Sequence, residues 1–274
     1  MKKWYYLADF SNKNLVKVNS KNGETNIVLE DIAFEDVKFR NILKKSVNER
    51  YLILKKNNQN LEIYQLEENS GDLNIKQTLN IEDIEGELGL VLEFGFINNN
   101  RILTFSSKGY ITIHKIKPKT GEIEILSKKI IENFSEKSME ITSFTTDIRY
   151  EYLCTSLSYK NQRRVELSIH RIKEKDLIFI TKLIIENISE INTLKFINSD
   201  FKNILSLNGI SNLKSGSEIF LFTFNKEAGV LQEILKERQK INIKGVKGLC
   251  VTLNSRLYGV GEASKILEIE NFSS

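Results

Sequence analysis

The sequence has little proline and cysteine, and no hydrophobic run long enough to cross a membrane. One proline in 274 residues excludes a proline-rich linker or stalk. Two cysteines exclude a disulfide-stapled scaffold and a four-cysteine zinc site. No apolar run approaches the ~18 residues of a membrane-spanning helix, and the apolar residues 4–8 are too few for the core of a signal peptide. We therefore expect an intracellular protein, cytoplasmic or nuclear.

The composition is typical of a folded globular chain, with 41% hydrophobic and 28% charged residues. The formal net charge is only +4, and acidic and basic residues are interleaved along the whole length. A nucleic-acid-binding domain concentrates a larger basic excess on one face. The charge pattern therefore indicates an ordinary solvated surface.

Short β-like runs closed by turns recur along the chain. Within three of them a ring residue is followed seven positions later by a glycine: Tyr64 and Gly71, His114 and Gly121, Phe222 and Gly229. A tight hairpin turn often needs a positive φ, which glycine adopts without strain. A fourth copy at His170 replaces the glycine turn with residues 173–176. The ring positions are 50, 56 and 52 residues apart, which is within the range of propeller repeats.

Each of these four units has a further strand upstream, at residues 36–39, 90–96, 140–144 and 192–196, and three-strand sets lie at both ends. We expect the first set to lack its inner strand and the last its outer strand. Runs such as residues 219–222 are apolar on both faces, as in stacked blades, whereas a half-solvated sheet alternates apolar and polar residues. A helical pattern over residues 230–240 is too short for an α/β protein.

The sequence therefore predicts an all-β fold, a β-propeller of about six four-stranded antiparallel blades, or seven if the ends hold further strands. We expect a single domain over residues 1–274. Its approximate repeats are residues 1–32, 36–80, 88–131, 140–186, 190–238 and 241–272.

The pattern resembles the WD-repeat family. Residues 106–114 and 259–269 look like the hairpin between the second and third strands of a WD-repeat blade. In this alignment the family's tryptophan is replaced by Tyr64, His114, His170 and Phe222, and its aspartate by Gln65, Lys115, Arg171 and Thr223. The chain contains no Trp-Asp pair and no Gly-His signature. The resemblance implies a divergent WD-repeat-like propeller without the aspartates of the family's hydrogen-bond network.

Two histidines and two cysteines are the first candidates for chemistry. His114 and His170 occupy equivalent positions in neighbouring repeats, where a shared metal or acid–base role would need them close together. Such positions are well separated in neighbouring blades, so we expect each histidine to replace a packed aromatic residue. Cys154 and Cys250 lie in apolar runs with no neighbouring histidine, which favours buried thiols over nucleophiles.

Aspartates that follow strands are the second set. Asp9, Asp147 and Asp200 are placed to line the mouth of a central channel, as a propeller hydrolase would require. Aspartate is also a common turn former, and we favour that role. The sequence therefore predicts no catalytic, cofactor-binding or metal-binding residue.

The densest basic cluster lies in a predicted hairpin, residues 158–175. Its members are Lys160, Arg163, Arg164, Arg171, Lys173 and Lys175. Facing residues of a hairpin can gather such charges on one edge, where RNA, an acidic protein or an anionic lipid surface could bind. We favour the alternative of a solvated loop partly balanced by glutamates.

These observations favour a non-catalytic protein–protein interaction scaffold, a propeller subunit of a larger intracellular assembly whose partners are other protein subunits. This expectation rests partly on analogy between folds. Two alternatives stay open: a propeller hydrolase or lactonase with a central-channel site, and an RNA or anionic-lipid binder that uses the basic hairpin.

Overall fold

The computed structural model of the chain describes most of the sequence. The described residues are 4–9, 11–32, 42–46, 48, 50–55, 60–80, 89–132, 134–135, 137–147, 149–159, 161–198, 203–211, 217–233, 248–251, 256–260 and 266–271. Within residues 203–221 and 248–271 it describes the backbone only. No helix in this part of the chain is long and apolar enough to cross a membrane.

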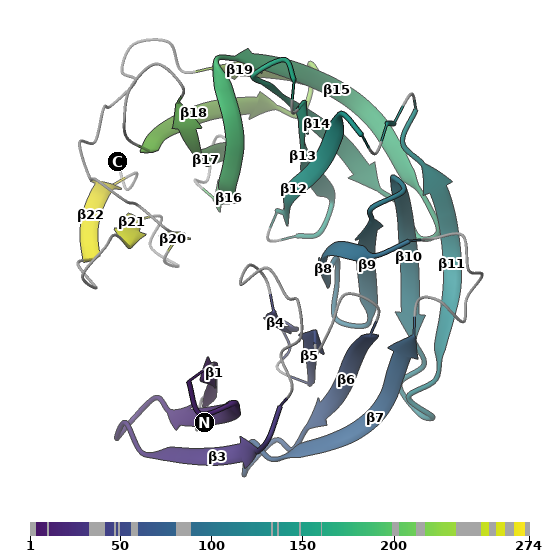
Figure 1. Cartoon of the computed structure of the whole chain (residues 1–274), viewed down its shortest axis with the longest axis vertical. Helices are drawn as coiled ribbons and strands as arrows, with labels where there is room; N and C mark the ends of the chain where they lie inside the picture. Colours follow the sequence, from purple (N-terminus) through teal and green to yellow (C-terminus); the bar gives the residue numbers. More distant parts are fainter. Residues whose placement is uncertain are drawn as a thin grey trace. The chain divides into compact units, whose positions relative to one another are not determined.

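The described residues form six antiparallel sheets that follow one another along the chain (Figure 1). The first sheet contains β1 (Trp4–Asp9), β2 (Asn14–Asn19) and β3 (Thr25–Leu29). The second contains β4 (Leu43–Lys45), β5 (Tyr51–Lys55), β6 (Asn60–Leu66) and β7 (Leu73–Asn80). The third contains β8 (Val91–Phe96), β9 (Arg101–Ser106), β10 (Tyr110–Ile116) and β11 (Ile123–Ile130).

The other three sheets repeat this arrangement. The fourth contains β12 (Met139–Thr146), β13 (Tyr152–Tyr159), β14 (Arg164–Ile172) and β15 (Leu177–Glu186). The fifth contains β16 (Ile188–Asn198), β17 (Asn203–Ser211), β18 (Ser217–Asn225) and β19 (Val230–Glu233). The sixth contains β20 (Gly248–Val251), β21 (Arg256–Val260) and β22 (Ile266–Asn271). The expected all-β architecture of four-stranded antiparallel sheets is confirmed.

The chain divides into two compact units, Met1–Phe134 and Ser135–Ser274. Within the first unit β1 contacts β4 and β4 contacts β8, and within the second β12 contacts β16 and β16 contacts β20. The contacts between neighbouring sheets of a unit therefore include the strand that comes first along the chain in each sheet. The assignment of a single domain over residues 1–274 stays a prediction.

Apolar side chains between neighbouring sheets of a unit form its core. Ile53 and Ile63 of the second sheet pack with Phe94 and Ile102 of the third. All five residues of β5 are buried, as expected for a strand covered on both faces. Burial on both faces explains why these strands lack the alternation of a half-solvated sheet.

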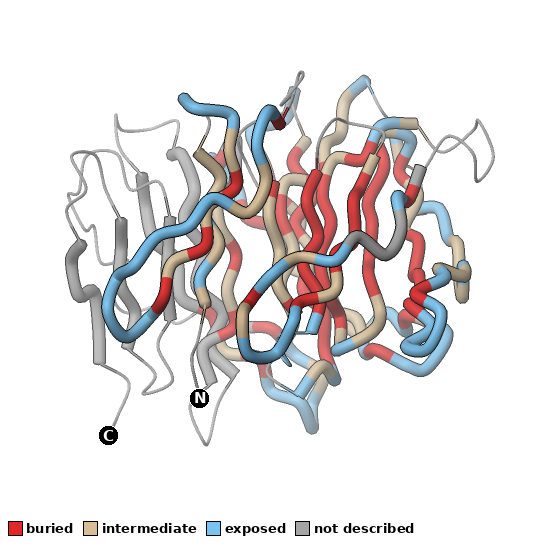
Figure 2. Tube along the Cα trace, turned by 90° about the horizontal axis from the view of Figure 1, so that it is seen from below, coloured by how far each residue is buried: buried red, intermediate tan, exposed pale blue. Residues whose placement is uncertain are grey.

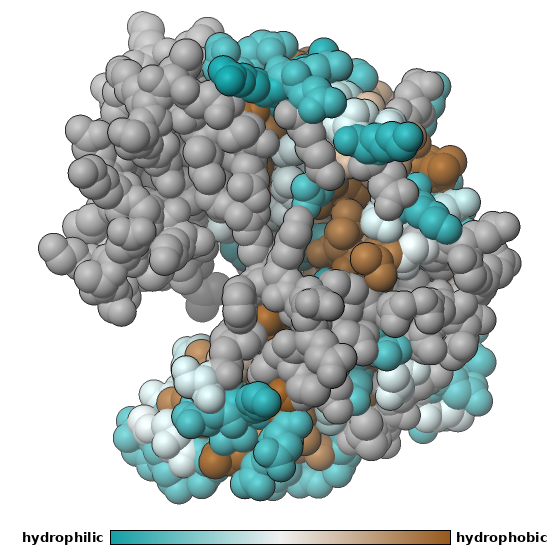
Figure 3. All heavy atoms as spheres, viewed as in Figure 1, coloured by the Kyte–Doolittle hydropathy of each residue, from teal (hydrophilic) through white to brown (hydrophobic). Residues whose placement is uncertain are grey.

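Buried residues concentrate in the strands, and exposed residues concentrate in the turns (Figure 2). Hydrophilic side chains cover much of the described surface in Figure 3.

A β-bulge recurs at the ring position of the third strand. The pairing with the fourth strand shifts by one residue at Tyr64, at His114 and at His170, with the extra residue on the fourth strand. The same shift occurs between β2 and β3 and between β21 and β22. Both three-stranded sheets therefore correspond to the second, third and fourth strands of a complete sheet. The expectation that the last unit lacks its outer strand is wrong, because β22 occupies that position.

The predicted turns are also confirmed. Gly71, Gly121 and Gly229 have φ values of 67°, 78° and 64°, and the turn without glycine closes through the N–H of Lys173 donating to the carbonyl of Asp176 (2.8 Å). The helical pattern over residues 230–240 was misleading where it can be checked, because β19 begins at Val230 and pairs with β18. The predicted strand at residues 36–39 lies outside the described residues.

Candidate functional site

The basic residues of the predicted hairpin do not gather at one place. Arg163 and Arg164 lie at the start of β14, whereas Arg171, Lys173 and Lys175 lie at its end and in the following turn. Arg171 lies seven positions after Arg164 along the strand, a distance of roughly 23 Å. Lys160 lies outside the described residues.

Arg164 is held by its own sheet. Its guanidinium lies over the ring of Tyr159, 4.2 Å from the centroid. On the same face Glu166 accepts hydrogen bonds from the hydroxyl of Ser168 (3.1 Å) and from Lys182 Nζ (3.2 Å). The charge of this face is therefore partly balanced within the sheet, as the solvated-loop reading expects.

The two histidines occupy packed positions. His114 is fully buried, and its Nε2 lies 2.9 Å from the hydroxyl of Thr104 on the neighbouring strand. Burial lowers the pKa of His114 to about 4, so the ring is neutral near pH 7. His170 packs edge-on against Phe179, with the ring centroids 5.8 Å apart. Both contacts fit the expected structural role of these rings.

The remaining sequence candidates are also structural where they are described. Cys154 is completely buried, and burial raises the pKa of its thiol. Asp9 accepts hydrogen bonds from the side chain and backbone N–H of Asn12, which lower its pKa. Asp147 accepts the backbone N–H of Tyr152 at 2.8 Å. The side chain of Cys250, and Asp200, lie outside the description. No group of three or more metal-ligating side chains occurs among the described residues.

A cluster of buried charged side chains lies between the second and third sheets. Lys55 and Glu93 are both buried, although each belongs to a largely apolar strand. Lys55 Nζ donates to the carbonyl of Val91 at 2.6 Å. We call Lys44, Lys55 and Glu93 the inner-strand charge cluster. Burying a charge is costly unless it is paired, so such residues require either a structural or a chemical reason.

The cluster has one partly open end. Lys44 on β4 is partly exposed, and its Nζ lies 4.0 Å from Oε1 of the buried Glu93 on β8. The buried Glu62 belongs to the other face of the second sheet, where it lies opposite Leu54 and accepts a hydrogen bond from the hydroxyl of Tyr64. Burial, followed by the hydrogen bond to Glu62, raises the pKa of Tyr64. An ammonium group beside a shielded carboxylate can bind a polar ligand and can exchange protons with it.

The sequence analysis missed this cluster. Its signal was a charge embedded in an apolar run, as Glu93 is within residues 90–96 and Lys55 is at the end of residues 51–55. Periodicity indicates that such strands are buried. It does not show that charges 38 residues apart along the chain, at positions 55 and 93, belong to one cluster.

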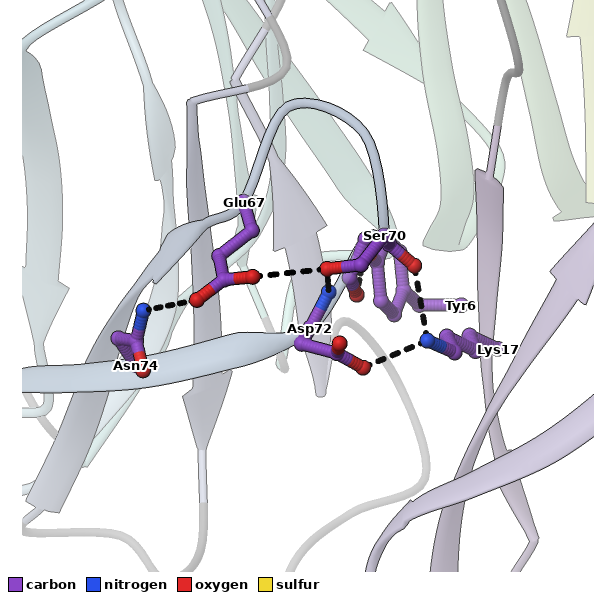
Figure 4. A network of polar contacts seen from close by, with 7 residues as sticks. Tyr6, Lys17, Glu67, Ser70, Asp72 and Asn74 are labelled. Atoms are coloured by element: carbon purple, nitrogen blue, oxygen red, sulfur yellow. Dashed lines mark hydrogen bonds and ion pairs between the residues drawn. The ribbon is translucent and has the colours of Figure 1, made fainter.

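A second polar network ties the first sheet to the second (Figure 4). Lys17 Nζ lies 2.6 Å from Oδ1 of Asp72, donates to the carbonyl of Ser70 at 2.8 Å and lies 4.8 Å from the ring centroid of Trp4. The hydroxyl of Tyr6 donates to the carbonyl of Gly71 at 2.7 Å. Hydrogen bonds from Lys17 and Ser70 lower the pKa of Asp72. All of these groups are engaged, so we assign the network to structure.

The second unit contains a comparable contact. Lys226, in the turn between β18 and β19, places its Nζ 3.6 Å from Asp147 Oδ2 and 3.6 Å from Glu151 Oε2. It also lies 4.9 Å from the ring centroid of Tyr152. The turn after a third strand is thus fastened to the neighbouring sheet in both units.

Comparisons with known proteins give similarity at the level of structure. No protein-family model matches the chain, and no curated protein matches it. A candidate 6-phosphogluconolactonase of Bacteroides fragilis aligns with a TM-score of 0.53 at 10% identity over 98% of this chain and 93% of that one. The periplasmic gluconolactonase of Pseudomonas aeruginosa aligns with a TM-score of 0.54 at 9% identity over 99% and 92%. The fold is a β-propeller.

Another structure with a similar fold is named for a different activity. Hydrazine synthase of Kuenenia stuttgartiensis aligns with a TM-score of 0.64 at 8% identity over 94% of this chain and 70% of that chain. One fold thus serves unrelated chemistries, and identities this low establish the fold alone. The propeller fold implied by the WD-repeat resemblance is confirmed, but membership of the WD-repeat family is not, and the similar structures include propeller lactonases.

Proposed function

We propose that this propeller hydrolyses a lactone, with Glu93 and Lys44 at the reacting centre. The observation that carries the proposal is the extent of the structural match, because propellers named as lactonases align with nearly the whole of this chain and of their own. Of the alternatives that the sequence left open, the comparisons favour this one over the interaction scaffold.

Lactone hydrolysis needs a base for water and a positive group for the developing oxyanion. In our proposal the Glu93 carboxylate accepts a proton as the oxygen of water attacks the carbonyl carbon. The carbonyl oxygen becomes negative beside the Lys44 ammonium. The ring C–O bond then breaks, and Glu93 returns the proton to the departing oxygen. The product is an open-chain hydroxy acid, whose carboxyl group ionises and releases one proton.

The surroundings of Glu93 suit this role. Its carboxylate is buried on β8, so attacking water would meet it away from bulk solvent. Lys44 is the partly exposed member of the pair and lies on β4, the first strand of the second sheet. In our proposal a substrate reaches Glu93 from the side of Lys44.

The test follows proton release after addition of glucono-δ-lactone or its 6-phosphate to the purified chain. We expect ring opening faster than the spontaneous reaction, and Glu93→Gln to lower the enzymatic rate by about 100-fold or more, the range of general-base catalysis. Lys115→Met is the matched control, because Lys115 forms an exposed pair with Glu124. Circular dichroism melting checks that each variant is folded. An uncatalysed rate with the wild-type chain, or an unchanged rate with folded Glu93→Gln, would contradict the proposal.

A second candidate is an interaction propeller that binds another protein through its first sheet. Leu7, Val16 and Ile27 are direct cross-strand neighbours, and Tyr5, Leu7 and Ile27 are each more than half exposed. Exposed apolar patches of this kind are typical of interfaces. A tagged pull-down from the native cell should recover a stoichiometric partner, and Leu7→Lys should lose that partner. Recovery of the chain alone would exclude this candidate.

A further inference from the structure

The fourth sheet ends in an unusually long and apolar edge strand. β15 pairs with β14 on one side and is the last strand of its sheet (Figure 1). It has ten residues, and Ile178, Phe179 and Ile184 are 45%, 55% and 43% exposed. Proteins usually protect edge strands by keeping them short or by placing charges on them. The last strand of the third sheet, β11, does so with Lys128 and Lys129 near its end.

The second half of β15 is a regular strand. The bulge between Ile169 and His170 places its extra residue, Ile180, before this half. From there the side chains alternate: Leu183 and Ile185 pack against the core of the unit, whereas Lys182, Ile184 and Glu186 are exposed. The edge strand therefore carries an apolar residue flanked, two positions away on either side, by opposite charges: Lys182, which also bonds Glu166 of its own sheet, and Glu186, which lies opposite Arg164.

This pattern is self-complementary. In an antiparallel pair, residues directly opposite each other lie on the same face of the sheet. If β15 pairs with its own copy about a two-fold axis at Ile184, Ile184 meets Ile184 of the other copy, and each Lys182 meets Glu186. A register centred on Lys182 would oppose like charges, and one centred on Leu183 would oppose Lys182 with Ile184.

We propose that a second copy of this chain pairs edge to edge with β15, in the register centred on Ile184. The fourth sheets of the two copies would then join into one continuous sheet. The contact is isologous, because both copies contribute the same strand. The unpaired backbone groups of each edge would gain partners, and the exposed isoleucine would be covered. The proposal is independent of the lactonase activity.

Disulfide trapping tests the register directly. In a Cys250→Ser background, with Cys154 completely buried, Ile184→Cys should form a disulfide-linked dimer on mild oxidation. Opposed cross-strand residues fall within the Cα separation that a disulfide requires. Ile178→Cys is the matched control, since it is equally exposed on the same strand but is not opposite itself. Equal trapping of both variants, or of neither, would overturn the proposed register.

Charge reversal tests the pairing without any covalent link. Lys182→Glu and Glu186→Lys each place like charges in both pairs and should weaken dimerisation roughly tenfold in sedimentation velocity. An equimolar mixture of the two variants restores opposite charges and should associate again. Circular dichroism confirms folding of each variant. A wild-type chain that stays monomeric at every concentration, or a mixture that does not associate, would overturn the proposal.

Discussion

Replacing Gly71 by alanine should destabilise the protein by more than backbone strain alone. Gly71 has a φ of 67° in the turn between β6 and β7. A Cβ atom placed there would lie 2.5 Å from Cδ1 and 2.6 Å from Cγ of the Trp4 ring. The ring belongs to the neighbouring sheet, and Lys17 lies over it. Relief of the clash therefore has to disturb the contact between the two sheets.

The expected cost has two parts. A left-handed conformation at alanine costs about 1–2 kcal/mol. Displacement of the packed Trp4 ring adds about 1–3 kcal/mol, the usual range for overpacking. The sum is about 2–5 kcal/mol of unfolding free energy.

Gly23 provides a matched control. It occupies the equivalent turn of the first sheet with a φ of 72°, and an added Cβ would meet nothing within 4 Å. Gly23→Ala should therefore show only the strain, about 1–2 kcal/mol. In a Trp4→Ala background the cost of Gly71→Ala should fall to the same value.

Urea unfolding followed by far-ultraviolet circular dichroism measures these differences. Fluorescence offers a second probe in the chains that retain Trp4, the only tryptophan. Equal destabilisation by Gly71→Ala and Gly23→Ala would refute the reasoning, because it would mean that Trp4 does not pack on the turn.

Three further predictions concern buried polar groups. Lys17→Met should cost about 1–3 kcal/mol because it removes charged hydrogen bonds of a buried lysine. Lys117→Met removes only an exposed pair with Glu122 and should cost clearly less in the same urea assay. The pKa of His114 is about 4 when folded and 6.5 when unfolded, so stability should be full above pH 6.5 and fall by up to about 3 kcal/mol as the pH drops to 4. His114→Gln should flatten that slope, and an unchanged slope would contradict the assignment. Burial raises the pKa of the Cys154 thiol, so in a Cys250→Ser background a thiol reagent should label the chain only after unfolding. Labelling of the native chain would contradict its burial.

The repeat was predictable from sequence because its signals are local. The interval from a ring residue to a glycine marks the end of a strand and a turn that needs a positive φ, and both depend on neighbouring residues only. The helical pattern after Val230 failed because pairing with β18 outweighs a weak local preference.

The basic hairpin shows the limit of proximity along the chain. Arg163 and Lys175 are near in sequence, but the extended β14 holds their groups at opposite ends. The reverse applies to Lys17 and Asp72, which are 55 residues apart in sequence and in direct contact. A charge pattern along the sequence therefore shows how many charged residues a segment contains. Which of these charges come into contact depends on how the strands are arranged in the fold.

The sequence by itself determined the all-β class, the period of about fifty residues and the positions of the main turns, since alternation, run length and turn residues act over a few positions. Only the tertiary structure decided that the three described strands of each end sheet match the second to fourth strands of a complete sheet, and that Lys44 and Glu93 lie together. Those features depend on which strands become neighbours, which long-range burial of apolar surface decides and local preference does not.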